Sequence, residues 1–162
     1  TLYNTVIRAD LEVIERTRHS LPSSYMDMGL DTTVNLPSPE IDLKFRNNRN
    51  NPIYIRAFFS NKKIYFEIYG EPLPKGQKYE FRSEVYETIP APSPEIIKDY
   101  DGKYVKYEDE QYVHVESRKG YRVRVYKQIF ENGSLIKEEL FDTHFYSPVK
   151  GKIYEGVKKR ET

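Results

Sequence analysis

The chain has 162 residues, with 26 basic and 25 acidic side chains and a formal net charge of +1. This near balance argues against a nucleic-acid-binding protein, because such proteins usually carry a clear basic excess. The absence of cysteine excludes disulfides, thiolate zinc sites and a cysteine nucleophile within the chain. No apolar run reaches the roughly 18 residues that a membrane-spanning helix needs.

The first sixteen residues, TLYNTVIRADLEVIER, repeat their apolar side chains with the period of a helix. Apolar residues fill about half of the circumference, so the pattern predicts a largely buried amphipathic helix with Thr1 as its N-cap. Asp10 falls between two apolar stripes of this helix. A carboxylate there is either satisfied by hydrogen bonds or part of a site, and we favour the first interpretation.

The following residues, up to about residue 40, are rich in turn formers, and Pro22, Pro37 and Pro39 exclude a continuous helix. Alternating apolar residues then predict strands at 41–45, 53–59 and 64–70. The last two are separated by a short polar turn and predict a hairpin.

The segment 71–77, EPLPKGQ, contains two prolines and a glycine and predicts a linker. Beyond it the alternation of apolar residues indicates an all-β region. The Asn132-Gly133 pair predicts a hairpin, since both residues readily adopt positive φ. The predicted strands of this region are 78–89, 112–118, 121–130, 134–146 and 152–156.

The order of motifs in the first part of the chain resembles the VanW family, which is named after an accessory protein of glycopeptide (vancomycin) resistance clusters. The resemblance covers about residues 1–71 and rests on four segments. These are LYNTVIRADLEVIERTRHSLPSSY, GLDTTV, IDLKFRNNRNNPIYIRAFF and IYFEIYG.

The second part resembles the five-glycine (G-five) module that often follows VanW domains in envelope proteins. The residues that carry this resemblance are IPAPSP, Gly102, KGYRVRVYK, FENGSLIKEEL and YSPVKGKIYEG with Gly156. Together the two resemblances imply a VanW-like part at 1–71, a linker at 72–77 and a G-five-like all-β module at 78–160. They also imply an extracellular, envelope-associated Gram-positive protein.

In the VanW family a cysteine lies just upstream of the position of Thr1, so we expect that a segment before this chain has been removed. Together with that cysteine, His19 and Asp31 would stand in the chain order of a Cys–His–Asp peptidase or acyltransferase, with His19 as base and Asp31 as its partner. The plainer alternative is that His19 hydrogen-bonds locally and Asp31 caps a turn. The chain alone is expected to be inactive, and whether the family is enzymatic stays open.

The alternative to a catalytic function is the binding of a ligand. Exposed tyrosines can stack on sugar rings and donate a hydroxyl hydrogen bond, and the G-five resemblance implies peptidoglycan or another N-acetylglucosamine-containing glycan as partner. We predict Tyr121, Tyr126 and Tyr146 as ligand-binding residues. They come from a wider set of tyrosines on or near sheet faces: 65, 69, 104, 107, 112, 121, 126, 146 and 154.

These observations predict an α+β fold, with one amphipathic N-terminal helix packed on a small antiparallel sheet, followed by an elongated all-β module. The predicted function is that of an extracellular VanW-like protein that binds, or is positioned on, peptidoglycan. The alternatives are the non-nucleophilic half of a Cys–His–Asp enzyme acting on wall peptides, or a structural spacer. No cofactor, metal site, nucleic-acid partner or membrane span is predicted, although the acidic residues between 99 and 110 leave a weak calcium site open.

Overall fold

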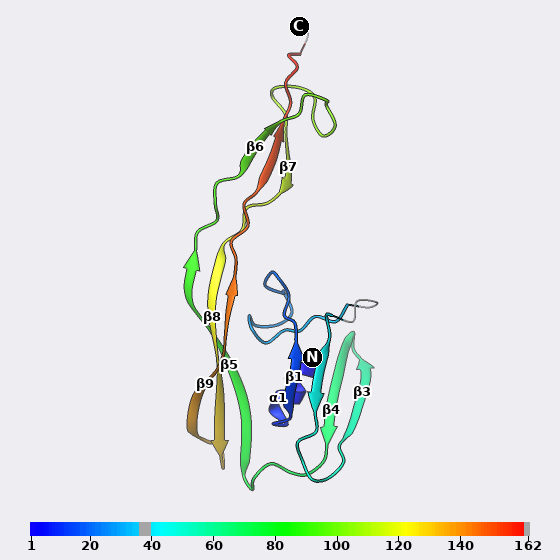
Figure 1. The fold of residues 1–162 in the computed structure, drawn as a ribbon, viewed down its shortest axis with the longest axis vertical. Helices are drawn as coiled ribbons and strands as arrows, with labels where there is room; N and C mark the ends of the chain where they lie inside the picture. The colour runs from blue at the N-terminus through cyan, green and yellow to red at the C-terminus, as the bar shows by residue number, and fades with distance from the viewer. Residues whose placement is uncertain (36–39, 161–162) are drawn as a thin grey trace. The chain divides into compact units, whose positions relative to one another are not determined.

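The computed structural model describes residues 1–35 and 40–160 (Figure 1). The chain splits into two compact units, which are described separately. Unit 1 comprises Thr1–Val85 and Val123–His144, and unit 2 comprises Tyr86–Arg122 and Phe145–Thr162. The predicted domain assignment, with its linker at 72–77, stays a prediction.

The described residues form one helix and ten strands. They are α1 (Leu2–Arg8), β1 (Glu12–Arg16), β2 (Leu43–Arg46), β3 (Tyr54–Ser60), β4 (Lys63–Tyr69), β5 (Gln77–Ile89), β6 (Glu95–Lys98), β7 (Gln111–Val115), β8 (Gly120–Glu131), β9 (Ser134–Tyr146) and β10 (Lys152–Glu155). They build four small sheets, ordered β1-β2, β3-β4, β5-β8-β9 and β6-β10-β7.

The predicted α+β fold class is wrong, because the chain is nearly all β. Strands account for 51% of the described residues and helix for 4%, and α1 has seven residues where the sequence predicted a helix of sixteen. Residues 12–16 form strand β1, which pairs antiparallel with β2. The β-branched Val13 and Ile14 suit such a strand.

The helix ends at Arg8 with Ala9 as its C-cap, and the next residue, Asp10, adopts a left-handed backbone conformation with φ 57°. The Asp10 N–H donates to the Ile7 carbonyl at 3.1 Å and the Leu11 N–H donates to the Val6 carbonyl at 3.2 Å. These two hydrogen bonds form a Schellman motif, in which a buried Leu11 accompanies a buried Val6. Aspartate tolerates this conformation better than most residues, so the helix stops although the apolar period continues.

The core of unit 1 joins the first residues of the chain to strands that follow much later. Tyr3, Ile7 and Leu30 pack with Tyr79 and Phe81 of β5 and Val125 of β8 in one buried cluster. Figure 1 shows α1 beside β1 and β4, and the Thr5 hydroxyl donates to the Phe66 carbonyl of β4 at 3.4 Å. The short helix is therefore stabilised from several sides.

In unit 2, β10 pairs parallel with β6 and antiparallel with β7. Strand β6 lies inside the proline-rich stretch that the sequence did not predict as a strand. The predicted hairpins β3–β4 and β8–β9 are confirmed, with Asn132 and Gly133 both at positive φ. Pro37 and Pro39 lie outside the described residues.

Candidate functional site

The structure brings His19 and Asp31 together. The Nδ1 atom of His19 lies 2.7 Å from Oδ2 of Asp31, and the same oxygen accepts the His19 backbone N–H at 2.8 Å. Asp31 is 1% exposed, whereas about a third of the His19 side chain is accessible to solvent. The carboxylate is thus a buried anchor for a partly exposed imidazole.

Arg16 of β1 holds the loop that carries Asp31. Its guanidinium donates to the Asp31 carbonyl at 2.6 and 2.8 Å and to the Gly29 carbonyl at 2.8 Å, and one of its nitrogens lies 3.6 Å from the Asp31 carboxylate. The guanidinium also lies over the Tyr3 ring, 4.4 Å from its centroid. The buried Arg16 side chain therefore holds the backbone of the Asp31 loop and also places a positive charge beside the Asp31 carboxylate.

Two opposing effects set the pKa of Asp31. Burial acts to raise it, because a low-dielectric environment disfavours the charged form. Hydrogen bonds from the His19 backbone and side chain, together with the positive charge of Arg16, more than offset burial and hold the pKa below its ordinary value. Asp31 is therefore ionised at neutral pH.

An ionised Asp31 orients the imidazole of His19. The carboxylate can only accept, so a neutral His19 places its proton on Nδ1 and leaves a lone pair on Nε2. Nε2 lies 3.4 Å from the hydroxyl of Tyr25, whose ring stands edge-on to the imidazole. This is the arrangement of a histidine base with its orienting carboxylate, and the catalytic role of the pair stays a prediction.

Tyr25 also lines a groove of about 880 Å³ with predominantly apolar walls. The groove runs along the start of α1 and the end of the β3–β4 hairpin, where Ile64 and Phe66 contribute to its wall. Tyr25 thus places the His19 side chain beside a space large enough for a small ligand.

A second histidine–aspartate pair lies on the other side of Arg16. His144 Nε2 lies 3.2 Å from Asp142 Oδ2, and Arg16 lies 3.7 Å from the same carboxylate. Burial acts to raise the pKa of Asp142, but the neighbouring His144 side chain, the Thr143 backbone N–H and the positive charge of Arg16 outweigh burial, so the pKa is lowered. The sequence analysis did not single out this pair, because β9 places it next to Arg16 only in the folded chain.

The predicted ligand-binding tyrosines are divided between the two units. Tyr121 and Tyr146 belong to unit 2, whereas Tyr126 belongs to unit 1 and lies under the guanidinium of Arg82, 4.5 Å from its ring centroid. Tyr146 is 1% exposed and offers no ring face to solvent. Their role in ligand binding stays a prediction.

Unit 2 instead gathers four other rings, Tyr104, Tyr112, His114 and Tyr154, which we call the aromatic cluster. Tyr104 stacks on Tyr112 at 5.1 Å between ring centroids and lies 4.3 Å from Tyr154. His114 lies 5.3 Å from Tyr104 and 5.6 Å from Tyr154. The three tyrosines belong to the wider set above, and the alternation of β7 is the sequence signal that places His114 on the same face as Tyr112.

Tyr104 is the member of the aromatic cluster that lies outside a strand, and the buried carboxylate of Asp99 positions it. Asp99 accepts hydrogen bonds from the backbone N–H groups of Lys103, Tyr104 and Val105 at 3.0, 2.6 and 2.9 Å. These backbone hydrogen bonds lower the pKa of Asp99, because they stabilise the charged form. The loop is therefore folded around Asp99 in a way that presents Tyr104 to the β7–β10 face.

Comparison with known proteins finds a family similarity for the first part of the chain. The family model described as VanW like protein matches residues 1–69. Residues 1–69 are therefore similar to this family and are called the VanW-like segment below. The uncharacterized protein YoaR of Bacillus subtilis (strain 168) is 42% identical over 57 residues, which cover 35% of this chain and 18% of YoaR. The chain therefore spans less than a fifth of that relative.

Two solved G5 domains are also similar to this chain. The IgA1 protease G5 domain is 21% identical, with a TM-score of 0.32, and the similarity covers 51% of this chain and 94% of that domain. HP0197-G5 is 18% identical, with a TM-score of 0.25, over 49% of this chain and 97% of that domain. Both are G5 domains, the kind of module that the second part of the sequence resembles.

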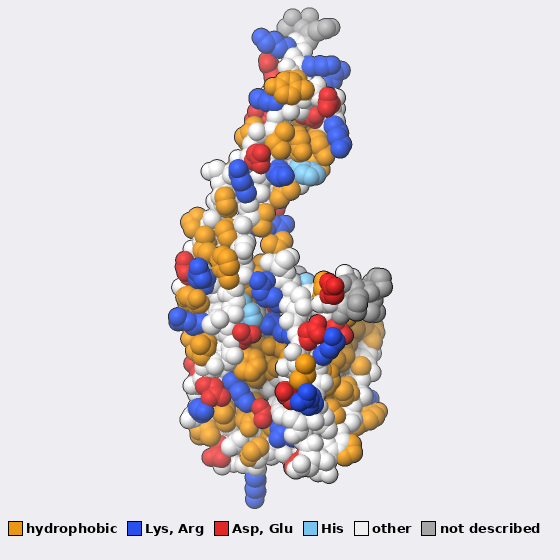
Figure 2. Space-filling view, in the orientation of Figure 1, with side chains coloured by type: hydrophobic (Ala, Val, Ile, Leu, Met, Phe, Trp, Pro, Cys, Tyr) orange, Lys and Arg blue, Asp and Glu red, His pale blue; other side chains and the backbone are white. Residues whose placement is uncertain are grey.

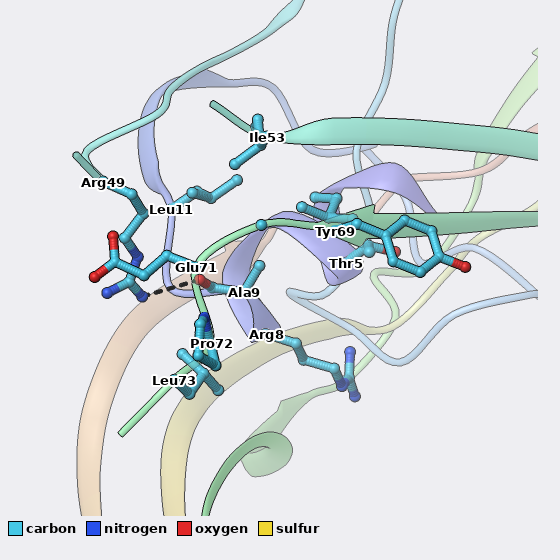
Figure 3. A pocket seen from close by; sticks show the side chains of 12 residues that line it. Thr5, Arg8, Ala9, Leu11, Arg49, Ile53, Tyr69, Glu71, Pro72 and Leu73 are labelled. Atoms are coloured by element: carbon cyan, nitrogen blue, oxygen red, sulfur yellow. Dashed lines mark hydrogen bonds between the residues drawn. The ribbon is translucent and has the colours of Figure 1, made fainter. Parts of the chain in front are cut away.

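The VanW-like segment supplies His19, Asp31, Arg16 and Tyr25 itself. It also lines a pocket of about 430 Å³ with Arg8 and Arg49 in its wall (Figure 3). Both guanidinium groups are already paired, since Arg49 donates to the Ala9 carbonyl at 3.1 Å and Arg8 to Glu80 at 3.0 Å. This pocket therefore offers no arginine without a partner to an anionic ligand.

Within residues 1–35 and 40–160, no group of three or more histidine, cysteine or acidic side chains is arranged to hold a metal ion. In the same residues, no helix is long and apolar enough to cross a membrane. The chain contains no cysteine, so a reaction of the predicted Cys–His–Asp type would need a thiol from outside residues 1–162.

Proposed function

We propose that this chain is part of an extracellular, cell-envelope-associated protein that binds peptidoglycan or another N-acetylglucosamine-containing glycan. The aromatic cluster of unit 2 is the observation that carries this proposal. Its rings lie within 4.3–6.1 Å of one another, and Tyr112 is 43% exposed. A role in glycopeptide resistance would follow only from the VanW relationship and belongs to the same proposal.

The cluster has the chemistry that sugar recognition requires. The apolar face of a sugar ring stacks on a tyrosine face, while the surrounding hydroxyls accept and donate hydrogen bonds. The tyrosine hydroxyls and the His114 ring nitrogens supply such partners beside the stacking faces. The rings also restrain one another, so little conformational entropy is lost when a sugar binds.

Sedimentation with insoluble peptidoglycan tests this function. We expect the purified chain to pellet with peptidoglycan, and we expect Tyr112→Ala to weaken retention about tenfold, the loss of roughly 1.4 kcal/mol of stacking. Tyr100→Ala is the matched control, because Tyr100 is 76% exposed in the same unit and lies outside the cluster. Equal retention of both variants, or no pelleting above an unrelated protein, would rule out the cluster as the binding surface.

The 2.7 Å contact between His19 and Asp31 favours a second candidate function, the base half of a Cys–His–Asp peptidase or acyltransferase acting on wall peptides. The nucleophile would come from a cysteine-containing segment N-terminal to Thr1. We expect a protein that includes this segment to cleave or transfer wall peptides, and His19→Gln to abolish turnover without changing sedimentation with peptidoglycan. Turnover that is unaffected by His19→Gln would exclude this role.

A further inference from the structure

Strand β3 is an open edge of unit 1. Among the described residues it hydrogen-bonds to β4 alone, and Figure 1 shows it on the outer side of the hairpin, away from α1. Its seven residues pair with β4 without a bulge. Such an edge presents unpaired N–H and C=O groups to any other strand.

The usual protections of an edge strand are missing from β3. Proline, bulges and several charged side chains normally discourage pairing with another chain. The sequence of β3, YIRAFFS, has one charged residue, Arg56, and this side chain already lies 3.4 Å from Glu67. Nothing in the strand itself therefore opposes the addition of another strand.

Large apolar side chains are exposed along the same strand. Phe59 is 71% exposed and Ile55 is 41% exposed, and Figure 2 shows hydrophobic side chains at the surface of this region. Exposed apolar side chains beside an unpaired strand edge are typical of strand-addition interfaces.

The geometry of the β3–β4 hairpin decides which backbone N–H and C=O groups of β3 point away from β4. Asn61 and Lys62 both have positive φ and form the two-residue turn, so Ser60 and Lys63 make the hydrogen-bonded pair next to it. Backbone groups alternate along an antiparallel strand. The N–H and C=O groups of Ile55, Ala57 and Phe59 therefore point to the open edge.

We propose that β3 pairs antiparallel with β3 of a second copy of this chain, across a two-fold axis at Ala57. Ala57 then faces Ala57 of the other copy, and all outward N–H and C=O groups find partners at once. A two-fold axis is the commonest symmetry of protein dimers, and it makes the same patch serve both copies. The product is a four-stranded sheet, β4-β3-β3-β4.

The side chains of β3 are complementary to themselves in this register. Ile55 lies opposite Phe59, which brings the exposed apolar side chains of the two copies together. Arg56 lies opposite Phe58, so each guanidinium meets an aromatic ring, as it already does within one chain at 4.7 Å. The two Arg56 side chains do not face each other, so no like-charge pair opposes the dimer.

Single cysteines test the register, because the chain contains none of its own. We expect Ala57→Cys to form a covalent dimer under mild oxidation or with a short bis-maleimide, since paired residues lie about 5.5 Å apart. Tyr54→Cys is the control, because the two copies of residue 54 would lie roughly 20 Å apart. Cross-linking of both variants at equal rates, or of neither, would overturn the proposed register.

Analytical ultracentrifugation tests the association without cross-linking. We expect the chain to show a concentration-dependent monomer–dimer equilibrium, and Phe59→Lys to weaken it on the order of 100-fold, because two copies of the ring leave the interface. Because Phe59 is exposed, this substitution should leave the circular dichroism spectrum unchanged, and it should leave the thermal midpoint unchanged at concentrations where the unmodified chain is monomeric. A strictly monomeric chain over the whole concentration range, with that spectrum intact, would refute the proposal independently of glycan binding.

Discussion

At the residue scale, Gly29 shows how closely the VanW-like segment approaches β8 and β9. Its φ is +80°, and an added Cβ would lie 2.5 Å from His144 Cδ2 and 2.7 Å from Val125 Cγ2. Both neighbours are well packed, so neither can move away at low cost. Gly29 therefore sits at the point where the Asp31 loop meets the later strands.

We expect Gly29→Ala to destabilise the chain by about 2–4 kcal/mol, because positive φ and overpacking act together. Gly133→Ala separates the two causes, since Gly133 has φ +86° and no atom within 4 Å of the added Cβ. That control should cost only about 1 kcal/mol. The free energy of unfolding in urea measures both, and equal values for the two variants would contradict the close packing at Gly29.

Asp31 should make stability depend on pH. Its folded pKa lies below the ordinary value of about 3.9, so its stabilising contribution is complete above that value and is lost as pH falls through the folded pKa. We expect Asp31→Asn to lower the free energy of unfolding at pH 7. The difference from the unmodified chain should shrink below about pH 4, and a difference that stays constant down to pH 2 would contradict this explanation.

At the element scale, the sequence predicted more of the sheet than of the helix. Alternation located the hairpins correctly because period-two patterns and positive-φ turns are local signals. The helix was predicted too long because 3.6-residue spacing continues past Asp10, while the Schellman motif depends on one left-handed residue that the spacing does not reveal. Strand β6 was missed because its parallel partner, β10, lies far along the chain.

The contacts at the candidate sites also differ in how far the sequence predicts them. The pairing of His19 with Asp31 could be anticipated from motif order, whereas Arg16, Asp142 and His144 come together only through tertiary packing. The choice of Tyr121, Tyr126 and Tyr146 among fifteen tyrosines stays a prediction, because the sequence does not show how exposed each ring is. Alternation indicates a face of a strand but does not show whether that face is exposed, and Tyr146 is 1% exposed.

We expect residues 1–76 alone to be unfolded. The buried cluster around Tyr3, Ile7 and Leu30 needs Tyr79, Phe81 and Val125 as its other half, and removing them exposes apolar surface worth several kcal/mol. The ion pair between Asp10 and Lys127, at 2.7 Å, would be lost as well. Chemical-shift dispersion and urea unfolding of this fragment, compared with the whole chain, measure the effect, and a cooperative transition of the fragment would contradict it.

At the scale of the whole molecule, the two candidate sites belong to different compact units. The His19–Asp31 pair lies in unit 1 and the aromatic cluster lies in unit 2. Unit 1 combines the VanW-like segment with parts of β5, β8 and β9, so the compact unit extends beyond the residues that match the family model. Binding and base chemistry, if both occur, can therefore be altered separately by substitution.

The binding of a glycan by the aromatic cluster is the central claim, and an NMR titration with soluble N-acetylglucosamine oligomers tests it most directly. We expect the ring resonances of His114, Tyr104, Tyr112 and Tyr154 to shift in a saturable way, because a stacked sugar changes the ring currents and environment of each. The His19 resonances in unit 1 should stay unchanged. Saturable shifts confined to residues outside the cluster, or no shift at any concentration, would contradict the claim.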